Sequence, residues 1–154
     1  MSPSERGYGA ATMLTLGVDT KITLLAAGLT FLLALCLGIW KYRQMATNEN
    51  HLAHPYVDTA HRAALLYSFA TLLVATFVEL SAWATWVNLT AAMVLVFFFL
   101  MAIVTYIVHG ALRDTTNHFE QHRATTTPAM TALIGGEIGG FAVLLAGFTA
   151  GQFF

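Results

Sequence analysis

Charged side chains are scarce in this chain. Only 10% of its 154 residues are Asp, Glu, Lys or Arg, whereas 57% are hydrophobic. Soluble domains carry about 25% charged residues, because their surfaces face water. The shortage excludes a water-soluble globule and indicates an integral membrane protein.

Cysteine pairs and an excess of basic residues are also missing. The single cysteine, Cys36, lies within an apolar run, so no internal disulfide can form. A formal net charge of -1 argues against a nucleic-acid partner, because binding to phosphates depends on Lys and Arg. The chain also contains no Gly-rich phosphate loop, no nucleophile elbow and no Cys-x-x-Cys motif.

Four long apolar segments account for most of the sequence. A membrane-spanning helix needs about 20 apolar residues, and the segments 22–40, 63–83, 89–108 and 128–150 meet that length. We predict an all-α, integral membrane four-helix bundle. Its single four-span domain covers residues 22–154, and residues 1–21 form an N-terminal arm.

The basic residues are distributed unevenly about these spans. The long connections 41–62 and 109–127 contain Lys41, Arg43, Arg62, Arg113 and Arg123, whereas the other side has only Arg6 and Lys21. Cytoplasmic loops carry the excess of Lys and Arg in multi-pass proteins. We expect both long loops to face the cytoplasm and the protein to reside in the cell inner membrane.

Glu137 lies near the middle of the last apolar segment. A carboxylate near the bilayer centre costs several kcal/mol unless it is paired, protonated or facing a cavity. The glycines around it, such as Gly135 and Gly139, fit a helix-packing pattern. We expect Glu137 to face a cofactor; the alternative is a structural hydrogen bond to a neighbouring helix or subunit.

His61 opens the second span, and His109 ends the third on the same side of the membrane. Neutral imidazole is the usual protein ligand of haem iron and first-row metals. The two histidines could ligate one metal or both axial positions of a haem, while Tyr106 could supply a hydroxyl. The alternative is that all three rings lie at the headgroup boundary. His118 and His122 could also bind a metal if their segment is helical.

The layout resembles the styrene oxide isomerases, four-span membrane enzymes that rearrange an epoxide to a carbonyl. The resemblance rests on Gly38-Ile39-Trp40 at the end of span one, Pro55, Ala60-His61, Tyr106, and the loop residues Arg113 and Asn117. It implies that His61 is the axial ligand of haem b, that ferric iron is the Lewis acid, and that Tyr106 lies near the epoxide. It also implies a trimer with haem near a subunit boundary.

Three positions depart from the family pattern, namely Tyr67, Phe98 and Gly110 in place of asparagine, aspartate and asparagine. The leading hypothesis is a haem-b-binding membrane protein with epoxide-isomerase-like activity on a lipophilic small molecule. In it His61 is the metal ligand, Glu137 and His109 contact the cofactor, and Tyr106 is catalytic. The alternatives are a non-catalytic subunit of a larger membrane complex and a bis-histidine electron-transfer protein. We expect a homo-oligomer in the lipid bilayer.

Overall fold

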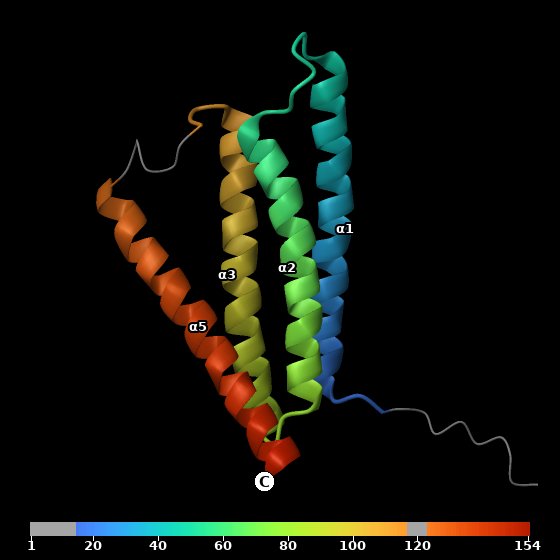
Figure 1. The fold of residues 1–154 in the computed structure, drawn as a ribbon, viewed down its shortest axis with the longest axis vertical. Coiled ribbons are helices and arrows are strands. Elements are labelled where there is room, and N and C mark those ends of the chain that lie inside the picture. The colour runs from blue at the N-terminus through green and yellow to red at the C-terminus, as the bar shows by residue number, and fades with distance from the viewer. Residues whose placement is uncertain (1–14, 117–122) are drawn as a thin grey trace, which may run out of the picture.

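The computed structural model describes residues 15–116 and 123–154, with the backbone alone for 123–127. These residues form four helices and no strand: α1 (Val18–Thr47), α2 (Pro55–Glu79), α3 (Thr85–Leu112) and α5 (Arg123–Phe153). The prediction of an all-α four-helix bundle is confirmed (Figure 1). His118, His122 and residues 1–14 of the expected N-terminal arm lie outside the described part of the chain.

All four helices are long and apolar enough to cross a bilayer. Large apolar side chains also cover the outside of the bundle; Leu25, Leu66 and Trp86 are 63%, 69% and 72% exposed. Such a surface is unfavourable in water and suits lipid. The protein is therefore a multi-pass integral membrane protein.

Local signals set the helix ends. Pro55 occupies the first turn of α2, where its missing N–H costs no hydrogen bond, and His54 caps this helix by accepting from the Tyr56 amide. Arg113 ends α3 in the left-handed conformation at φ 53. The helices differ slightly from the expected spans. Helix α1 begins at Val18 instead of residue 22, and α2 ends at Glu79, so the turn to α3 starts earlier than predicted.

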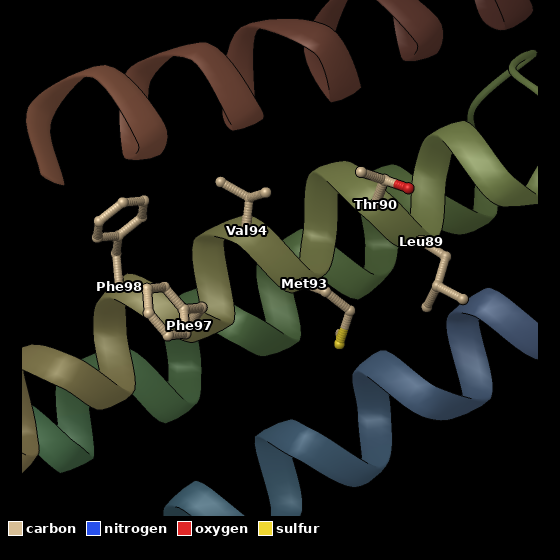
Figure 2. A pocket seen from close by; sticks show the side chains of 6 residues that line it. All are labelled: Leu89, Thr90, Met93, Val94, Phe97 and Phe98. Carbon is tan, nitrogen blue, oxygen red and sulfur yellow. The ribbon is translucent and has the colours of Figure 1, made fainter. Parts of the chain in front are cut away.

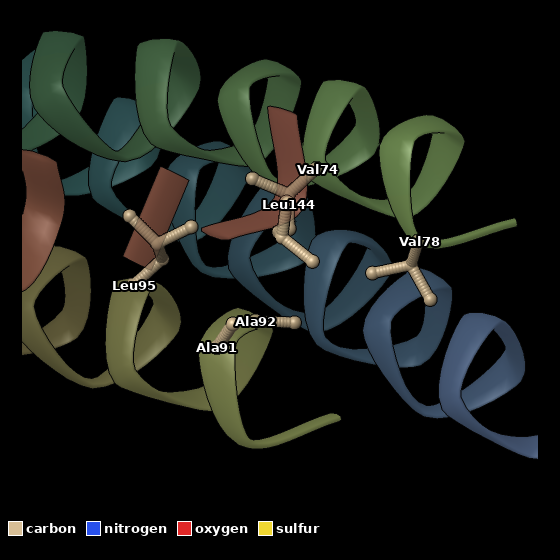
Figure 3. Packing of buried hydrophobic residues seen from close by; sticks show 6 residues of the cluster. All are labelled: Val74, Val78, Ala91, Ala92, Leu95 and Leu144. Atoms are coloured by element: carbon tan, nitrogen blue, oxygen red, sulfur yellow. The ribbon is translucent and has the colours of Figure 1, made fainter. Parts of the chain in front are cut away.

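Two clusters of buried apolar residues hold the bundle together. The cluster nearer the long α1–α2 connection joins α1, α2 and α3 and consists of Ala34, Leu37, Ala60, Ala64 and Ile103. The cluster nearer the α2–α3 turn joins α2, α3 and α5 and consists of Val74, Val78, Ala91, Ala92, Leu95 and Leu144 (Figure 3). The many alanines allow the helix backbones to approach closely, as membrane helices require.

Helix α5 crosses the bundle at an angle and separates from α3 towards its N-terminal end (Figure 1). Its C-terminal half is attached to the α2–α3 turn. The Trp83 indole donates to Val143 O at 2.9 Å, Ala82 N donates to Gly147 O at 3.0 Å, and Gln152 Nε2 donates to Leu80 O at 3.0 Å. α5 is thus fixed at one end of the bundle and less enclosed at the other.

Candidate functional site

His61 lies in the first part of α2 and faces α1. Its Nδ1 atom is 2.9 Å from the backbone oxygen of Ala34. Because a carbonyl oxygen can only accept, Nδ1 must carry the proton. The ring is partly buried, and it lies beside Gly38, where an added β-carbon would be 3.0 Å from His61 Cε1. The absence of a side chain at Gly38 therefore makes room for the imidazole.

This hydrogen bond determines the tautomer of the neutral ring. With the proton on Nδ1, the lone pair of His61 is on Nε2, and no described residue is hydrogen-bonded to Nε2. Metal-binding histidines commonly donate their other ring N–H to a backbone carbonyl, which orients the ring. The arrangement at His61 is the one expected of a single imidazole ligand.

An ion-pair group lies one turn before His61 on α2. Asp58 contacts Lys41 Nζ from α1, and Arg62 Nη2 is 3.0 Å from Asp58 Oδ2. Lys41 and Asp58 are partly exposed and Arg62 is exposed, as expected for charges at the end of a membrane helix. The group links α1 to α2 near the end of α2 that carries His61.

Tyr106 and His109 belong to a different aromatic group on α3. The Tyr56 ring from α2 is buried, and its centroid lies 6.1 Å from Tyr106 and 5.3 Å from His109. His109 Nδ1 donates to Asp114 Oδ1 at 2.8 Å, and this hydrogen bond lowers the pKa of the Asp114 carboxyl. Asp114 and Tyr56 thus fix the His109 ring at the end of α3.

Glu137 lies on α5 and interacts with a tyrosine of α2. Tyr67 of α2 is within electrostatic range of both Glu137 and Tyr106, and its ring stacks on Phe99 with the centroids 4.5 Å apart. The Oε1 atom of Glu137 is buried and has no hydrogen-bond partner among the described residues. Tyr67 is thus the tyrosine that interacts with Glu137, and Tyr106 interacts with Tyr67.

The described contacts do not bring the expected site residues into one bonded group. His61 bonds to Ala34 of α1, whereas Tyr106 lies beside Tyr56 and packs against the buried cluster that also contains Ala34. Within residues 15–116 and 128–154, no hydrogen bond, ion pair or ring contact joins His61 to Tyr106, His109 or Glu137. That part of the chain also contains no group of three or more His, Cys, Asp or Glu that could hold a metal ion.

Two groups near the candidate site residues carry no clear signal in the sequence. Tyr67 stands out there only as a departure from a family pattern; it lies six positions after His61 and therefore on another face of α2. The Ala34 carbonyl could not have been found, because a backbone oxygen leaves no residue-type signal. The only available hint was Gly38, one turn later on α1, whose small size permits the His61 ring to approach.

A shallow apolar groove of about 560 Å³ follows the outer surface of α3. Figure 2 shows its lining side chains, Leu89, Thr90, Met93, Val94, Phe97 and Phe98. The one hydroxyl among them, on Thr90, donates to Trp86 O of its own helix at 2.7 Å. The groove therefore offers shape and apolar contact, and no group that could take part in acid–base chemistry.

Comparison of the chain with protein-family models, curated proteins and solved structures finds no match.

Proposed function

We propose that this membrane protein binds haem b through His61 and acts as an epoxide-isomerase-like enzyme on a lipophilic small molecule. The observation that carries the proposal is the 2.9 Å hydrogen bond between His61 Nδ1 and Ala34 O. It holds the ring in one orientation and leaves the Nε2 lone pair for a metal. An imidazole that merely sat at the headgroup level would need no such support from a neighbouring helix.

The proposal takes His61 as the one protein ligand of the iron, as the resemblance to the styrene oxide isomerases implies. His109 Nδ1 donates to Asp114 Oδ1, a hydrogen bond of the kind that also orients metal-binding histidines, so the absorption spectrum must separate one imidazole ligand from two. A single imidazole leaves the opposite coordination position open to a substrate oxygen, as a Lewis-acid reaction requires. A low-spin bis-histidine spectrum would instead indicate an electron-transfer protein.

Each residue has a defined task in the proposal. When bound, ferric haem would supply a Lewis acid that polarises the C–O bond of the substrate. His61 holds the metal, the Ala34 carbonyl keeps the imidazole oriented, and Gly38 leaves space for it. Tyr106 positions the substrate, and Glu137 contributes charge near the cofactor. The surrounding apolar side chains would select a lipophilic substrate and exclude water.

The separation of His61 from Tyr106 bears on the assembly. No described hydrogen bond or ring contact joins the two side chains within one chain, so the proposal places the substrate where two chains meet. We therefore include a homo-oligomer, with a trimer as in the styrene oxide isomerases, in the proposal. Helix α5 offers surface for such contact, because only 11% of the residues in its most apolar 18-residue stretch are buried within one chain.

The test is the absorption spectrum of detergent-purified protein supplied with haem. Wild type should show a Soret band, His61→Ala should lose it, and added imidazole should restore it to His61→Gly. His109→Ala is the matched control and should keep the wild-type spectrum. A wild type without a Soret band, or an unchanged band in His61→Ala, would overturn the proposal.

The second candidate is a non-catalytic subunit of a larger membrane complex. The sparse burial of α5 favours it, because an unrelated chain could cover that helix as well as another copy could. A subunit of this kind should co-purify with other chains in fixed stoichiometry and should carry no haem alone. Homogeneous protein with bound haem would eliminate this alternative.

A further inference from the structure

Three polar side chains are buried together where α1 begins beside the α2–α3 turn. Asp19, Thr20 and Asn88 are 6%, 3% and 2% exposed. Asn88 Nδ2 is 3.5 Å from Asp19 Oδ2, and the Thr20 amide donates to Asp19 Oδ1 at 3.0 Å. The cluster lies towards the other end of the bundle from His61, and the proposed function does not use it.

Two oxygen atoms in this cluster have no hydrogen-bond partner among the described residues. They are Thr20 Oγ1 and Asn88 Oδ1. The Asn88 amide cannot simply be turned over, because its Nδ2 faces three acceptors: Asp19 Oδ2, Val78 O and Trp83 O, at 3.5, 3.5 and 3.2 Å. Buried polar atoms without a partner are rare in folded proteins, and a bound ion or water is one explanation for them.

The charge around the cluster is negative. Within residues 15–116, no Lys, Arg or His nitrogen lies within 4 Å of the Asp19 carboxylate. The N-terminus of α1 offsets part of this charge. However, the C-terminal end of α2 also lies here, with its partial negative charge and with Glu79, whose Oε2 is 3.4 Å from Gly17 N.

We propose that Asp19, Thr20 and Asn88 bind a monovalent cation of sodium size. A carboxylate, a hydroxyl and an amide carbonyl are oxygen ligands of the kind that hard cations prefer. One buried carboxylate balances one positive charge, whereas calcium sites usually combine several carboxylates. A cation would give both unpartnered oxygens a ligand and would neutralise a buried charge that is otherwise unfavourable.

Gly17 leaves space next to these oxygens. A β-carbon at this position would collide with Asp19 Oδ1 and would lie 3.8 Å from Thr20 Oγ1. The backbone of Gly17, at φ -58 and ψ 155, is open to any residue. The requirement for glycine is therefore one of space beside the carboxylate, and Gly17→Ala should displace the Asp19 carboxylate and obstruct the cation without straining the backbone.

The test is thermal unfolding of the full chain in detergent, with NaCl replaced by choline chloride at constant ionic strength. A bound cation stabilises the folded state by mass action, so the Tm of wild type should rise by several degrees with Na⁺ and saturate in the millimolar range. Asp19→Asn and Gly17→Ala should lose this rise. Gly28→Ala is the matched control, because no atom lies within 4 Å of its added β-carbon, and it should respond as wild type does.

Equal Tm values in NaCl and choline chloride would overturn the proposal and indicate that a water fills the cluster. A response in Asp19→Asn, or one as large with K⁺ as with Na⁺, would also overturn it. If Asp19→Asn does not fold, ²³Na NMR of wild type should show Na⁺ exchange broadening that Thr20→Val removes. His61→Ala should keep the Na⁺ response, so a failure of the cation proposal can be distinguished from a failure of the haem proposal.

Discussion

The α1–α2 seam and the α5 contact surface differ in how closely they are packed. In the seam, Ala34, Ala60 and Ala64 are fully buried. In the most apolar 18-residue stretch of each helix, 28% of the residues are buried in α1 and 33% in α2, against 11% in α5. Small residues let the first two helices lie close enough for His61 to bond an α1 carbonyl. The seam can therefore hold a side chain in one orientation, whereas α5 leaves its surface to lipid or to another chain.

Enlarging a buried alanine of the seam should have the largest effect on this difference. Ala34→Leu adds bulk at a fully buried position beside the His61 hydrogen bond, and we expect a loss of about 1–3 kcal/mol or more. The same substitution at Ala132, which is exposed on α5, should change stability by less than about 0.5 kcal/mol. Thermal unfolding in detergent measures both; equal losses would contradict the contrast between the two surfaces.

Removing the carboxylate of Glu137 from α5 should raise the stability of the isolated chain instead of lowering it. Glu137 Oε1 is buried without a partner, and an unsatisfied buried polar atom costs about 1–3 kcal/mol. Glu137→Leu should therefore stabilise the isolated chain, while Glu137→Gln should leave its stability nearly unchanged. A clear loss of stability in Glu137→Leu would instead show that a second chain donates a hydrogen bond to this carboxylate.

Weakening the attachment of α5 to the α2–α3 turn should reduce stability by less than the Ala34→Leu substitution does. Trp83→Phe removes the indole N–H that reaches Val143 O, and one such hydrogen bond contributes about 1 kcal/mol. Amide hydrogen exchange should rise in the C-terminal half of α5 and stay unchanged in α1. Trp86→Phe is the control, because this side chain is 72% exposed. Unchanged exchange in α5 after Trp83→Phe would contradict this prediction and would mean that the remaining hydrogen bonds to the α2–α3 turn hold α5 in place without the indole.

The smallest expected effect concerns the end of α3. The hydrogen bond from His109 lowers the pKa of Asp114 in the folded protein, so the ionised carboxylate favours folding. This contribution is present above the unfolded pKa, about 3.9 for aspartate, and is lost as pH falls through the lower folded pKa. Because Asp114 is solvent-exposed, the effect is small. Tm profiles of wild type and Asp114→Asn should differ slightly at pH 6 and converge in acid; a difference that grows in acid would refute this.

The architecture was predictable because it follows from composition. Segments with at most one charged residue, at the length of a bilayer, can only be buried in lipid or protein, and each of the four predicted spans overlaps one helix. The sequence predicted the ends of the helices less accurately. Asp19 and Lys21 suggested that α1 starts after them, but an acid in the first turn is favourable at a helix N-terminus, so the helix includes both.

The site could be predicted residue by residue but not as an arrangement. His61, Tyr106 and Glu137 were each conspicuous as polar groups in apolar surroundings. Which of them meet depends on the rotation of α2 about its axis, and small differences in helix packing set that rotation. His61 bonds to a backbone atom, the Ala34 carbonyl, and the residue that interacts electrostatically with Glu137 is Tyr67, a common residue type in membrane helices. Neither carries a distinctive pattern along the sequence.

The indole hydrogen bond between Trp83 and the backbone of α5 also supplies a built-in optical signal. Indole emission depends on whether its N–H is bonded and on how polar its surroundings are, so the fluorescence of Trp83 should report directly whether the last helix is docked. In a variant that keeps Trp83 and replaces Trp40 and Trp86 with phenylalanine, ligand binding or assembly that moves α5 would become visible in real time without any added dye.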